Sequence, residues 1–221
     1  MEIRYWLSQI WHFRTFKKSS YSAEGEDLII QSCFDEHEGT YIDIGAGHPM
    51  YGSNSFLFYK KGWKGITVDP VNGHKLLHRL SRNRDTFLQG VVSTMNEKLI
   101  EKQVYFYEFN PRELSTISIG HVEEMNQSGA KPRKIYQVSR FFLDELVRKL
   151  PEKLPYFISL DVEGYDFELI KEIKNLSRKP KVVCVETTHF KKEIENEMNL
   201  LGYSILMSTN LNSIFSYKNK S

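Results

Sequence analysis

The chain has 221 residues, of which 40% are hydrophobic and 26% charged, with 13 glycines and 7 prolines. This composition is typical of a globular protein, and it excludes fibrous, disordered and disulfide-dense chains. The formal net charge of +2 comes from 30 basic and 28 acidic side chains mixed along the sequence, so no overall field selects nucleic acid as a partner. A chain of this length buries enough surface to fold without a metal or disulfide staple.

Both cysteines, Cys33 and Cys184, lie within apolar runs. This placement predicts buried thiols in a reducing compartment rather than a disulfide. No run approaches the ~18 apolar residues that cross a bilayer, and polar residues interrupt the N-terminal segment too early for a signal peptide. We therefore expect a cytoplasmic protein.

The first 19 residues are predicted to form an amphipathic helix, which we separate from a domain at 20–221. The apolar side chains that recur at helical spacing are Ile3, Trp6, Leu7, Ile10 and Trp11. Two interpretations stay open for this helix. It packs against the rest of the fold or a partner subunit of an oligomer, or residues 3–18 make a peripheral contact with the inner face of the membrane.

From residue 40 onward, short β-branched or aromatic runs alternate with helical patterns, which indicates an α/β fold with a mostly parallel sheet and helices on both faces. The predicted parallel strands span residues 40–44, 66–69, 86–92, 156–161 and 181–186. The predicted helices span residues 54–61, with Asn54 as the N-cap, 142–150, 167–174 and 191–201. The last two apolar runs, 203–207 and 214–217, leave no room for a crossover helix, so they must pair antiparallel.

The stretch at about 101–138 interrupts this alternation and is predicted to be an insertion. Two strand-like runs, KQVYFYEFN and KIYQVS, flank a polar loop in it, and we expect the insertion to reach over the active site. Several of its polar residues would suit a sugar ligand or a solvated surface equally well. They are Arg112, Ser115, Thr116 and His121.

The most informative segment is YIDIGAGHP at 41–49, a strand that runs directly into a glycine turn. Gly45 and Gly47 let the backbone pass close to a ligand at the carboxyl edge of the sheet, where open α/β folds bind cofactors. A nicotinamide-binding loop would carry a third glycine where this chain has Met50. Asp43 is costly to bury without a partner, and that partner is either the amides of the glycine loop or an amino group of the cofactor.

Asp69 ends the next predicted strand, at the neighbouring strand tip. A carboxylate there can accept two hydrogen bonds from a ribose diol, which favours an adenosine-type ligand. Asp69 would equally serve as a turn or N-cap residue before the next helix. His48, beside the glycines, either faces a substrate or is an ordinary loop residue.

Several ordered motifs make the chain resemble the FkbM-type S-adenosylmethionine-dependent methyltransferases. They are YSAEGED at 21–27, YIDIGAGHP at 41–49, the Ser53-Asn54-Ser55 turn, GWKGITVDP at 62–70, ISLDVEGYD at 158–166 and VVCVE at 182–186. The mostly parallel sheet with an antiparallel C-terminal hairpin likewise resembles the Rossmann-like fold of class I methyltransferases. The chain departs from the family pattern at Ala23, where glutamine is common, and at Gly90 and Ser93, because no acid follows the third predicted strand.

The resemblance implies methyl transfer from S-adenosylmethionine to a hydroxyl group, commonly on a sugar of a glycan, a polysaccharide or a natural product. The acceptor would be a small molecule or a glycan. The residues that we assign to cofactor binding are Glu26, Asp43, Gly45, Ala46, Gly47, Asn54, Asp69, Pro70, Val92 and Asp161.

Because a methyl sulfonium is already activated, such an enzyme must mainly align an acceptor oxygen and remove its proton. Asp161, at the tip of the fourth predicted strand, is our first candidate for the base or an orienting group, and Glu163 and His189 are the next. Glu163 and Asp166 would equally begin the following helix, where the dipole favours acids. Together with Glu186, these acids would also suit a divalent cation, but no ligand spacing requires one.

Two other functions stay open. One is a nicotinamide- or nucleotide-sugar-binding oxidoreductase on a similar sheet, against which Met50 and the C-terminal hairpin count. The other is a catalytically silent binding module that engages a membrane or a partner through its N-terminal helix.

Overall fold

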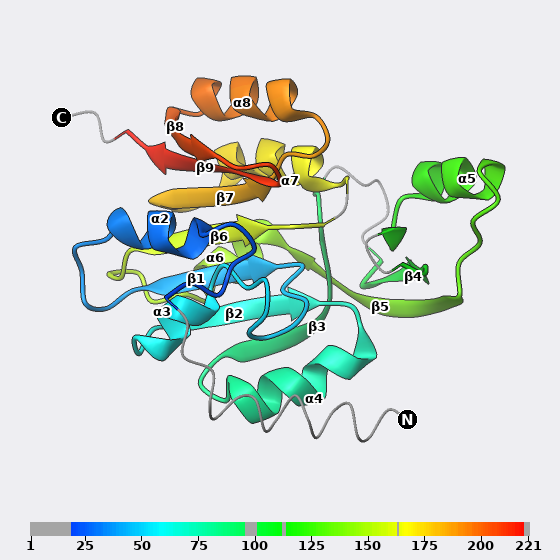
Figure 1. Ribbon diagram of the computed structural model, residues 1–221, viewed down its shortest axis with the longest axis horizontal. Coiled ribbons are helices and arrows are strands. Elements are labelled where there is room, and N and C mark those ends of the chain that lie inside the picture. The colour runs from blue at the N-terminus through cyan, green and yellow to red at the C-terminus, as the bar shows by residue number, and fades with distance from the viewer. Residues whose placement is uncertain (1–18, 96–100, 112–113, 163, 219–221) are drawn as a thin grey trace.

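The computed structural model describes residues 19–95, 101–111, 114–162 and 164–218 (Figure 1). The amphipathic helix predicted at 1–19, apart from its last residue, and the catalytic candidate Glu163 lie outside the described residues. Within the described part of the chain, no helix is both long enough and apolar enough to span a bilayer.

A nine-stranded sheet forms the middle layer, in the order β4-β5-β3-β2-β1-β6-β7-β9-β8. Its strands are β1 (Thr40–Ile44), β2 (Lys64–Asp69), β3 (Thr86–Ser93), β4 (Gln103–Glu108), β5 (Lys134–Phe142), β6 (Tyr156–Leu160), β7 (Val182–Glu186), β8 (Tyr203–Ser208) and β9 (Asn212–Tyr217). The neighbours within β3-β2-β1-β6-β7 all pair parallel, which confirms the predicted parallel core. Strands β1 and β6 are buried along their whole length, as expected for strands that are covered on both faces.

Helices cover both faces of the sheet (Figure 1). They are α2 (Glu26–Ser32), α3 (Phe56–Lys60), α4 (Asn72–Ser81), α5 (Ile119–Gln127), α6 (Leu143–Arg148), α7 (Asp166–Glu172), the 3-10 turn η2 (Ile173–Asn175) and α8 (Lys191–Leu200). Ile42 and Ile44 pack with side chains of α6, α7 and α8, whereas Tyr41 packs on the opposite face with side chains of α2 and α3. This division follows from the alternation of side chains along a strand.

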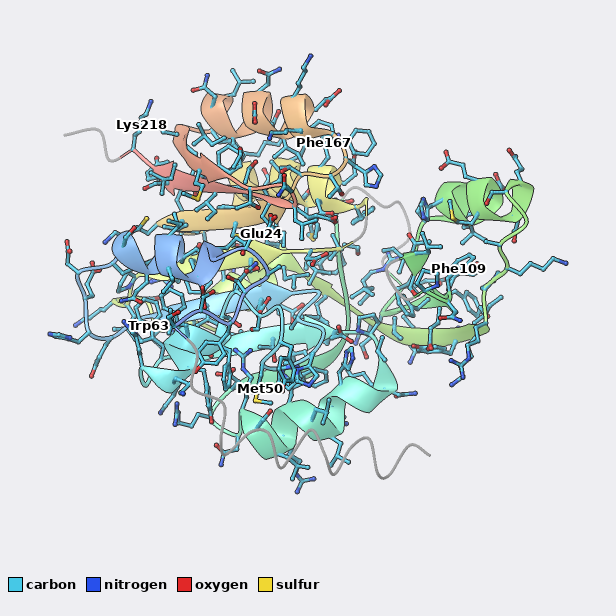
Figure 2. All side chains as sticks on the ribbon, in the orientation of Figure 1. Glu24, Met50, Trp63, Phe109, Phe167 and Lys218 are labelled. Carbon is cyan, nitrogen blue, oxygen red and sulfur yellow. The ribbon has the colours of Figure 1, made fainter. Side chains whose placement is uncertain are left out.

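The core beneath α2 and α3 is rich in aromatic rings. Trp63, labelled in Figure 2, is 4% exposed, and its ring centroid lies 5.1 Å from that of Phe34 and 4.9 Å from that of Phe58. Edge-on and tilted ring pairs of this kind add stability beyond the area that they bury. The cluster fixes the helices that flank the first strand, and therefore the loop that leaves it.

The two C-terminal strands pair antiparallel, as predicted. Strand β9 inserts between β7 and β8 and runs antiparallel to both. A β-bulge between Ile205 and Met207 shifts the register of this pair, and bulges of this kind increase the local twist of an edge strand.

The insertion contains both predicted strands, β4 and β5, which pair antiparallel. Strand β5 also pairs parallel with β3, so the insertion extends the main sheet and is not a separate lid. The segment between its strands, predicted as a polar loop, contains helix α5. Ser118 caps this helix by accepting a hydrogen bond from the His121 amide at 3.3 Å.

Some predicted helix bounds were wrong. Helix α3 begins at Phe56, and the Ser53 hydroxyl accepts the Phe56 amide at 3.2 Å, whereas Asn54 does not cap it. Helix α6 begins at Leu143 because Phe142 still pairs within the sheet. The sequence pattern gave no bounds for α2 and α4, and α4 buries only Leu77 and His78.

Candidate active site

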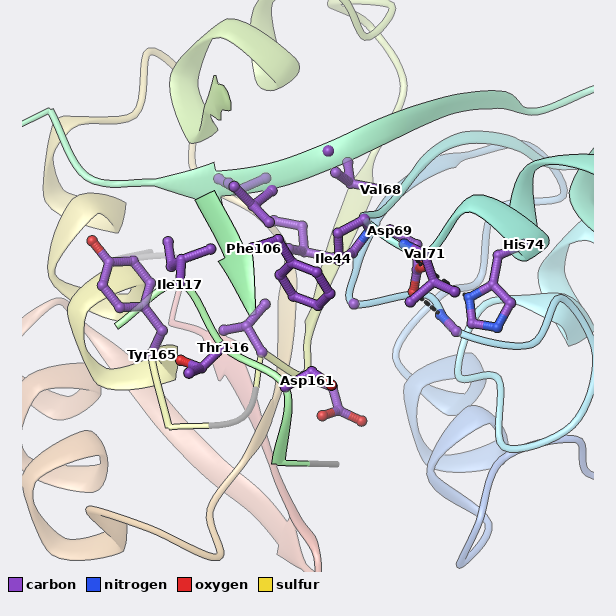
Figure 3. Close-up of a pocket in the computed structure, with 18 residues that line it drawn as sticks. Ile44, Val68, Asp69, Val71, His74, Phe106, Thr116, Ile117, Asp161 and Tyr165 are labelled. Carbon is purple, nitrogen blue, oxygen red and sulfur yellow. Dashed lines mark hydrogen bonds and ion pairs between the residues drawn. The ribbon is translucent and has the colours of Figure 1, made fainter. Parts of the chain in front are cut away.

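A cavity of about 310 Å³ opens at the carboxyl edge of β1, β2, β3 and β6 (Figure 3). This volume lies within the range of small-molecule sites. The cavity lies where open α/β sheets bind ligands, beyond the ends of adjacent parallel strands. The predicted site residues that line it are Gly45, Gly47, Asp69, Pro70, Val92 and Asp161.

The glycine loop after β1 forms one wall of this cavity. Gly45 and Gly47 both have positive φ, at 75° and 49°, in the left-handed region that glycine favours. The Gly45 and Ala46 amides donate to the Val68 carbonyl at 3.0 and 3.1 Å, and the Gly47 amide donates to Asp69 at 2.9 Å. These three amides are therefore already paired within the protein.

Asp69 stands at the tip of β2 and lines the cavity while only 5% exposed. Its Oδ2 accepts the Gly47 amide, and its Oδ1 accepts the Val71 amide at 2.8 Å and lies 2.8 Å from His74 Nδ1. Asp69 therefore stabilises the turn after β2 and also lines the cavity. Because a carboxylate offers about four acceptor positions, one position, on Oδ2, is left for a ligand hydroxyl.

Asp43 has a different partner from the one that we expected. Its Oδ2 accepts a short hydrogen bond from the Ser55 hydroxyl and lies 4.0 Å from Nη1 of the fully buried Arg82. Burial raises the pKa of Asp43, and the Arg82 charge opposes this rise. Asp43 is not among the residues that line the cavity. Its side chain instead binds the Ser53-Asn54-Ser55 turn through Ser55.

Asn54 and Glu26, also assigned to the cofactor, are not among the residues that line the cavity. Asn54 donates to the Ser159 hydroxyl at 3.1 Å and to Cys184 Sγ at 3.5 Å. Glu26 is fully buried and accepts from the Glu24 amide and from Asn212 Nδ2, both at 2.8 Å.

One polar row across the sheet explains the positions of Asp43 and Asn54. The strand register places Thr67, Asp43, Ser159 and Cys184 side by side across β2, β1, β6 and β7. Within the Ser53-Asn54-Ser55 turn, Asn54 hydrogen-bonds Ser159 and Cys184, and Ser55 hydrogen-bonds Asp43. Buried polar groups must be hydrogen-bonded, so the row fixes the turn in place beneath the glycine loop.

Asp161 lies between the Asp69 side and the Thr116 side of the cavity (Figure 3). The residue is exposed at the cavity. Partial burial of its carboxyl group, together with the charges of Glu186 and Asp166, raises the pKa of Asp161 to about 8. Burial and Glu186 raise the pKa of Asp166 to about 7. Asp161, just after β6, and Asp166, at the start of α7, therefore exchange protons near neutral pH.

The two histidine candidates lie outside the cavity. His189 is exposed in the loop between β7 and α8, and it is not among the lining residues. His48 Nδ1 accepts the Met50 and Tyr51 amides, both at 3.1 Å, which agrees with the loop alternative for this residue.

Several residues that line the cavity were not predicted from the sequence. His74 and Tyr165 join the wall from α4 and from the loop before α7. The insertion does reach the cavity, as expected, through Phe106, Ser115, Thr116 and Ile117. The Ser115 hydroxyl accepts the Phe109 amide, and the Thr116 hydroxyl accepts the Ser118 amide, both at 3.0 Å. Among the candidates in the insertion, Arg112 lies outside the described residues.

The metal prediction stays open. Among residues 19–95, 101–111, 114–162 and 164–218, no group of three or more His, Cys, Asp or Glu side chains is arranged to hold a metal ion. Glu163, one of the acids that we considered for such a site, lies outside these ranges.

Comparison with known proteins identifies the family. The model of the methyltransferase FkbM domain matches residues 43–205, which is most of the chain. A precorrin-6y C5,15-methyltransferase from Geobacter metallireducens is similar at 10% identity and a TM-score of 0.46, over 92% of this chain and 93% of that one. A TehB-like SAM-dependent methyltransferase from Corynebacterium glutamicum is similar at 10% identity and a TM-score of 0.44, over 97% of each chain. No curated protein matches in sequence. The chain therefore belongs to the FkbM family of S-adenosylmethionine-dependent methyltransferases.

Proposed function

We propose that the chain transfers the methyl group of S-adenosylmethionine to a hydroxyl group on a sugar of a glycan, a polysaccharide or a natural product. When bound, the cofactor supplies an activated methyl group on a positively charged sulfonium. The observation that carries the proposal is Asp161 at the cavity wall, with a pKa raised to about 8. The lining residues must bind S-adenosylmethionine and the acceptor, and one of them must take up the proton of the acceptor hydroxyl.

The charge of the cavity suits a cationic cofactor. Asp69 and Asp161 line it, and no described lysine or arginine does so. Partial burial and then the negative charges of neighbouring carboxylates raise the pKa of Asp161, and a positive charge brought close to these groups would oppose that rise. We therefore expect cofactor binding to be favoured electrostatically and to lower the pKa of Asp161.

The remaining walls suit a nucleoside. Ile44, Val68 and Phe106 offer apolar surface on which a flat base can pack, and ligand sites commonly combine such surface with a few polar groups. The open acceptor position on Asp69 Oδ2 suits a sugar hydroxyl. These residues fit S-adenosylmethionine in both charge and polarity.

A hydroxyl acceptor needs a base. A general base works best when its pKa lies near the operating pH, and the raised pKa of Asp161 meets this condition. In its ionised form the Asp161 carboxylate can take the proton of an acceptor hydroxyl, and it can then release that proton to water. Asp161 is thus the candidate catalytic residue, and the other lining residues hold the reactants beside it.

We place the acceptor beside the insertion, whose lining residues, among them Thr116 and Ile117, are uncharged. Uncharged walls next to a carboxylate favour a neutral hydroxyl compound over an anionic one. The family resemblance supports a sugar as the carrier of that hydroxyl.

The test is a transfer assay with methyl-labelled S-adenosylmethionine and a panel of neutral glycans and glycosylated natural products. We expect labelled product whose NMR spectrum shows a methyl ether. Asp161→Asn should bind S-adenosylhomocysteine and yet lose turnover, whereas Asp35→Asn, on an exposed loop, should keep it. Label found only on nitrogen, sulfur or carbon, or full turnover by Asp161→Asn, would overturn the proposal.

A further inference from the structure

His78 lies directly beneath the glycine loop. It comes from α4, is 1% exposed, and its ring lies 4.7 Å from that of Phe87. Its Nε2 is 3.1 Å from the Gly47 carbonyl oxygen, and its Nδ1 is 3.3 Å from the Thr67 hydroxyl. His78 does not line the cavity.

These two contacts determine which nitrogen of the His78 ring carries the proton. A carbonyl oxygen can only accept, so Nε2 must carry the hydrogen and donate to Gly47. Burial and the Arg82 charge lower the pKa of His78 to about 3, while Asp69 and the Gly47 carbonyl oppose this change. The ring is therefore neutral, and its bare Nδ1 accepts from Thr67. His78 is thus a buried hydrogen-bond donor that is present as the tautomer with its hydrogen on Nε2.

Gly47 is held from both sides as a result. Its carbonyl accepts from His78, and its amide donates to Asp69 Oδ2 at 2.9 Å. The second oxygen of Asp69 lies 2.8 Å from His74, one turn earlier on α4. Helix α4 thus determines the orientation of both the Gly47 peptide and the Asp69 carboxylate at the cavity wall.

We propose that His78 is a positioning residue of the cofactor site, which fixes the Gly47 peptide and through it the Asp69 carboxylate in the arrangement that binds S-adenosylmethionine. Without this donor, the Gly47 carbonyl loses its buried partner, and only the bond from the Gly47 amide to Asp69 still orients this residue. A site that must be ordered on binding has lower affinity than one that is already ordered.

The variants are His78→Leu, which removes the donor, and His78→Gln, whose amide can replace Nε2–H. Calorimetry with S-adenosylhomocysteine should show a Kd about tenfold higher for His78→Leu, or ~1.4 kcal/mol, and a value near that of the wild type for His78→Gln. In turnover with saturating acceptor, His78→Leu should raise the KM for S-adenosylmethionine far more than it changes kcat. If His78 only stabilised the fold, His78→Leu would not raise the KM more than it changes kcat. In that case His78→Gln would also not restore the Kd of the wild type.

Two controls separate positioning from stability. Leu77→Ala, at the neighbouring buried position of α4, should lower the melting temperature without changing the Kd, and the exposed His37→Leu should change neither. If His78→Leu does not fold, the shorter His78→Asn is compared with His78→Gln. An unchanged Kd in His78→Leu or His78→Asn would overturn the proposal. Because this readout needs no acceptor, its failure is distinct from failure of the proposed O-methyl transfer.

Discussion

Gly45 lies against the backbone carbonyl of Asp161, and a Cβ atom on residue 45 would stand 1.7 Å from that oxygen. The Asp161 amide also donates to the Ile44 carbonyl at 3.0 Å. The ends of β1 and β6 therefore meet where the cavity begins. In this chain the first glycine of the motif allows two strands to meet, and it brings the candidate base to the glycine loop.

Gly45→Ala should be strongly destabilising. The added methyl group meets backbone, which cannot move aside as a flexible side chain can, and the positive φ of 75° is itself unfavourable for alanine. We expect the free energy of unfolding in urea to fall by roughly 3 kcal/mol or more, or the chain not to fold.

Gly52→Ala is the matched control for this change. Gly52 has a nearly equal φ of 70°, but an added Cβ would meet nothing within 4 Å. Its cost should be only the ~1–2 kcal/mol of a left-handed alanine. Equal destabilisation by the two substitutions would contradict the close contact between Gly45 and Asp161.

The sequence predicted the parts of the site that follow from strand order. Strand β1 was predicted with its observed bounds, because an apolar run ends at a glycine on each side. Since the carboxyl ends of parallel strands meet at one edge, Asp69 and Asp161 were both predicted at the site, and both line the cavity.

The parts that escaped prediction depend on how helices dock. The charged partner of Asp43 is Arg82, which lies far along the sequence and reaches β1 only because α4 packs against the sheet. The contacts of His74 and His78 depend on the same docking. Strand β2 begins two residues earlier than predicted, at Lys64, because pairing with β1 outweighs the low strand propensity of Lys64 and Gly65.

Asp69→Ala should weaken the binding of S-adenosylmethionine by more than tenfold, or ~1.4 kcal/mol, because it removes the open acceptor at the cavity and the partner of the Gly47 amide. Calorimetry with S-adenosylmethionine and S-adenosylhomocysteine measures this change. The exposed Asp35→Ala is the control. NAD should give no binding heat with the wild type; binding of NAD alone would favour an oxidoreductase, and an unchanged Kd in Asp69→Ala would remove Asp69 from the cofactor site.

The pH dependence of turnover should report the ionisation of Asp161. Below its pKa of about 8 the carboxyl group is largely protonated and accepts no proton. We therefore expect kcat/KM to rise with pH and to level off above about 8, while kcat levels off at lower pH because a bound cation lowers the pKa. Asp166→Asn removes a like charge, so it should move the inflection of kcat/KM to lower pH. An inflection that Asp166→Asn leaves in place would contradict the assignment of this pKa to Asp161.

Asp161→Asn should stabilise the fold at neutral and alkaline pH. An aspartate in the unfolded chain has a pKa of about 3.9, whereas the pKa of Asp161 in the folded chain is about 8. Between these values the unfolded state binds fewer protons, so this group lowers the free energy of unfolding as pH rises. The free energy of unfolding of Asp161→Asn should exceed that of the wild type by an amount that grows from pH ~4 and levels off above about 8, as measured by urea unfolding across that range.

Asp35→Asn should show no such trend. If Asp161→Asn is less stable than the wild type at pH 9, this result would contradict the raised pKa of Asp161. A substitution that stabilises the fold and removes turnover would mean that Asp161 is kept for chemistry at the expense of stability.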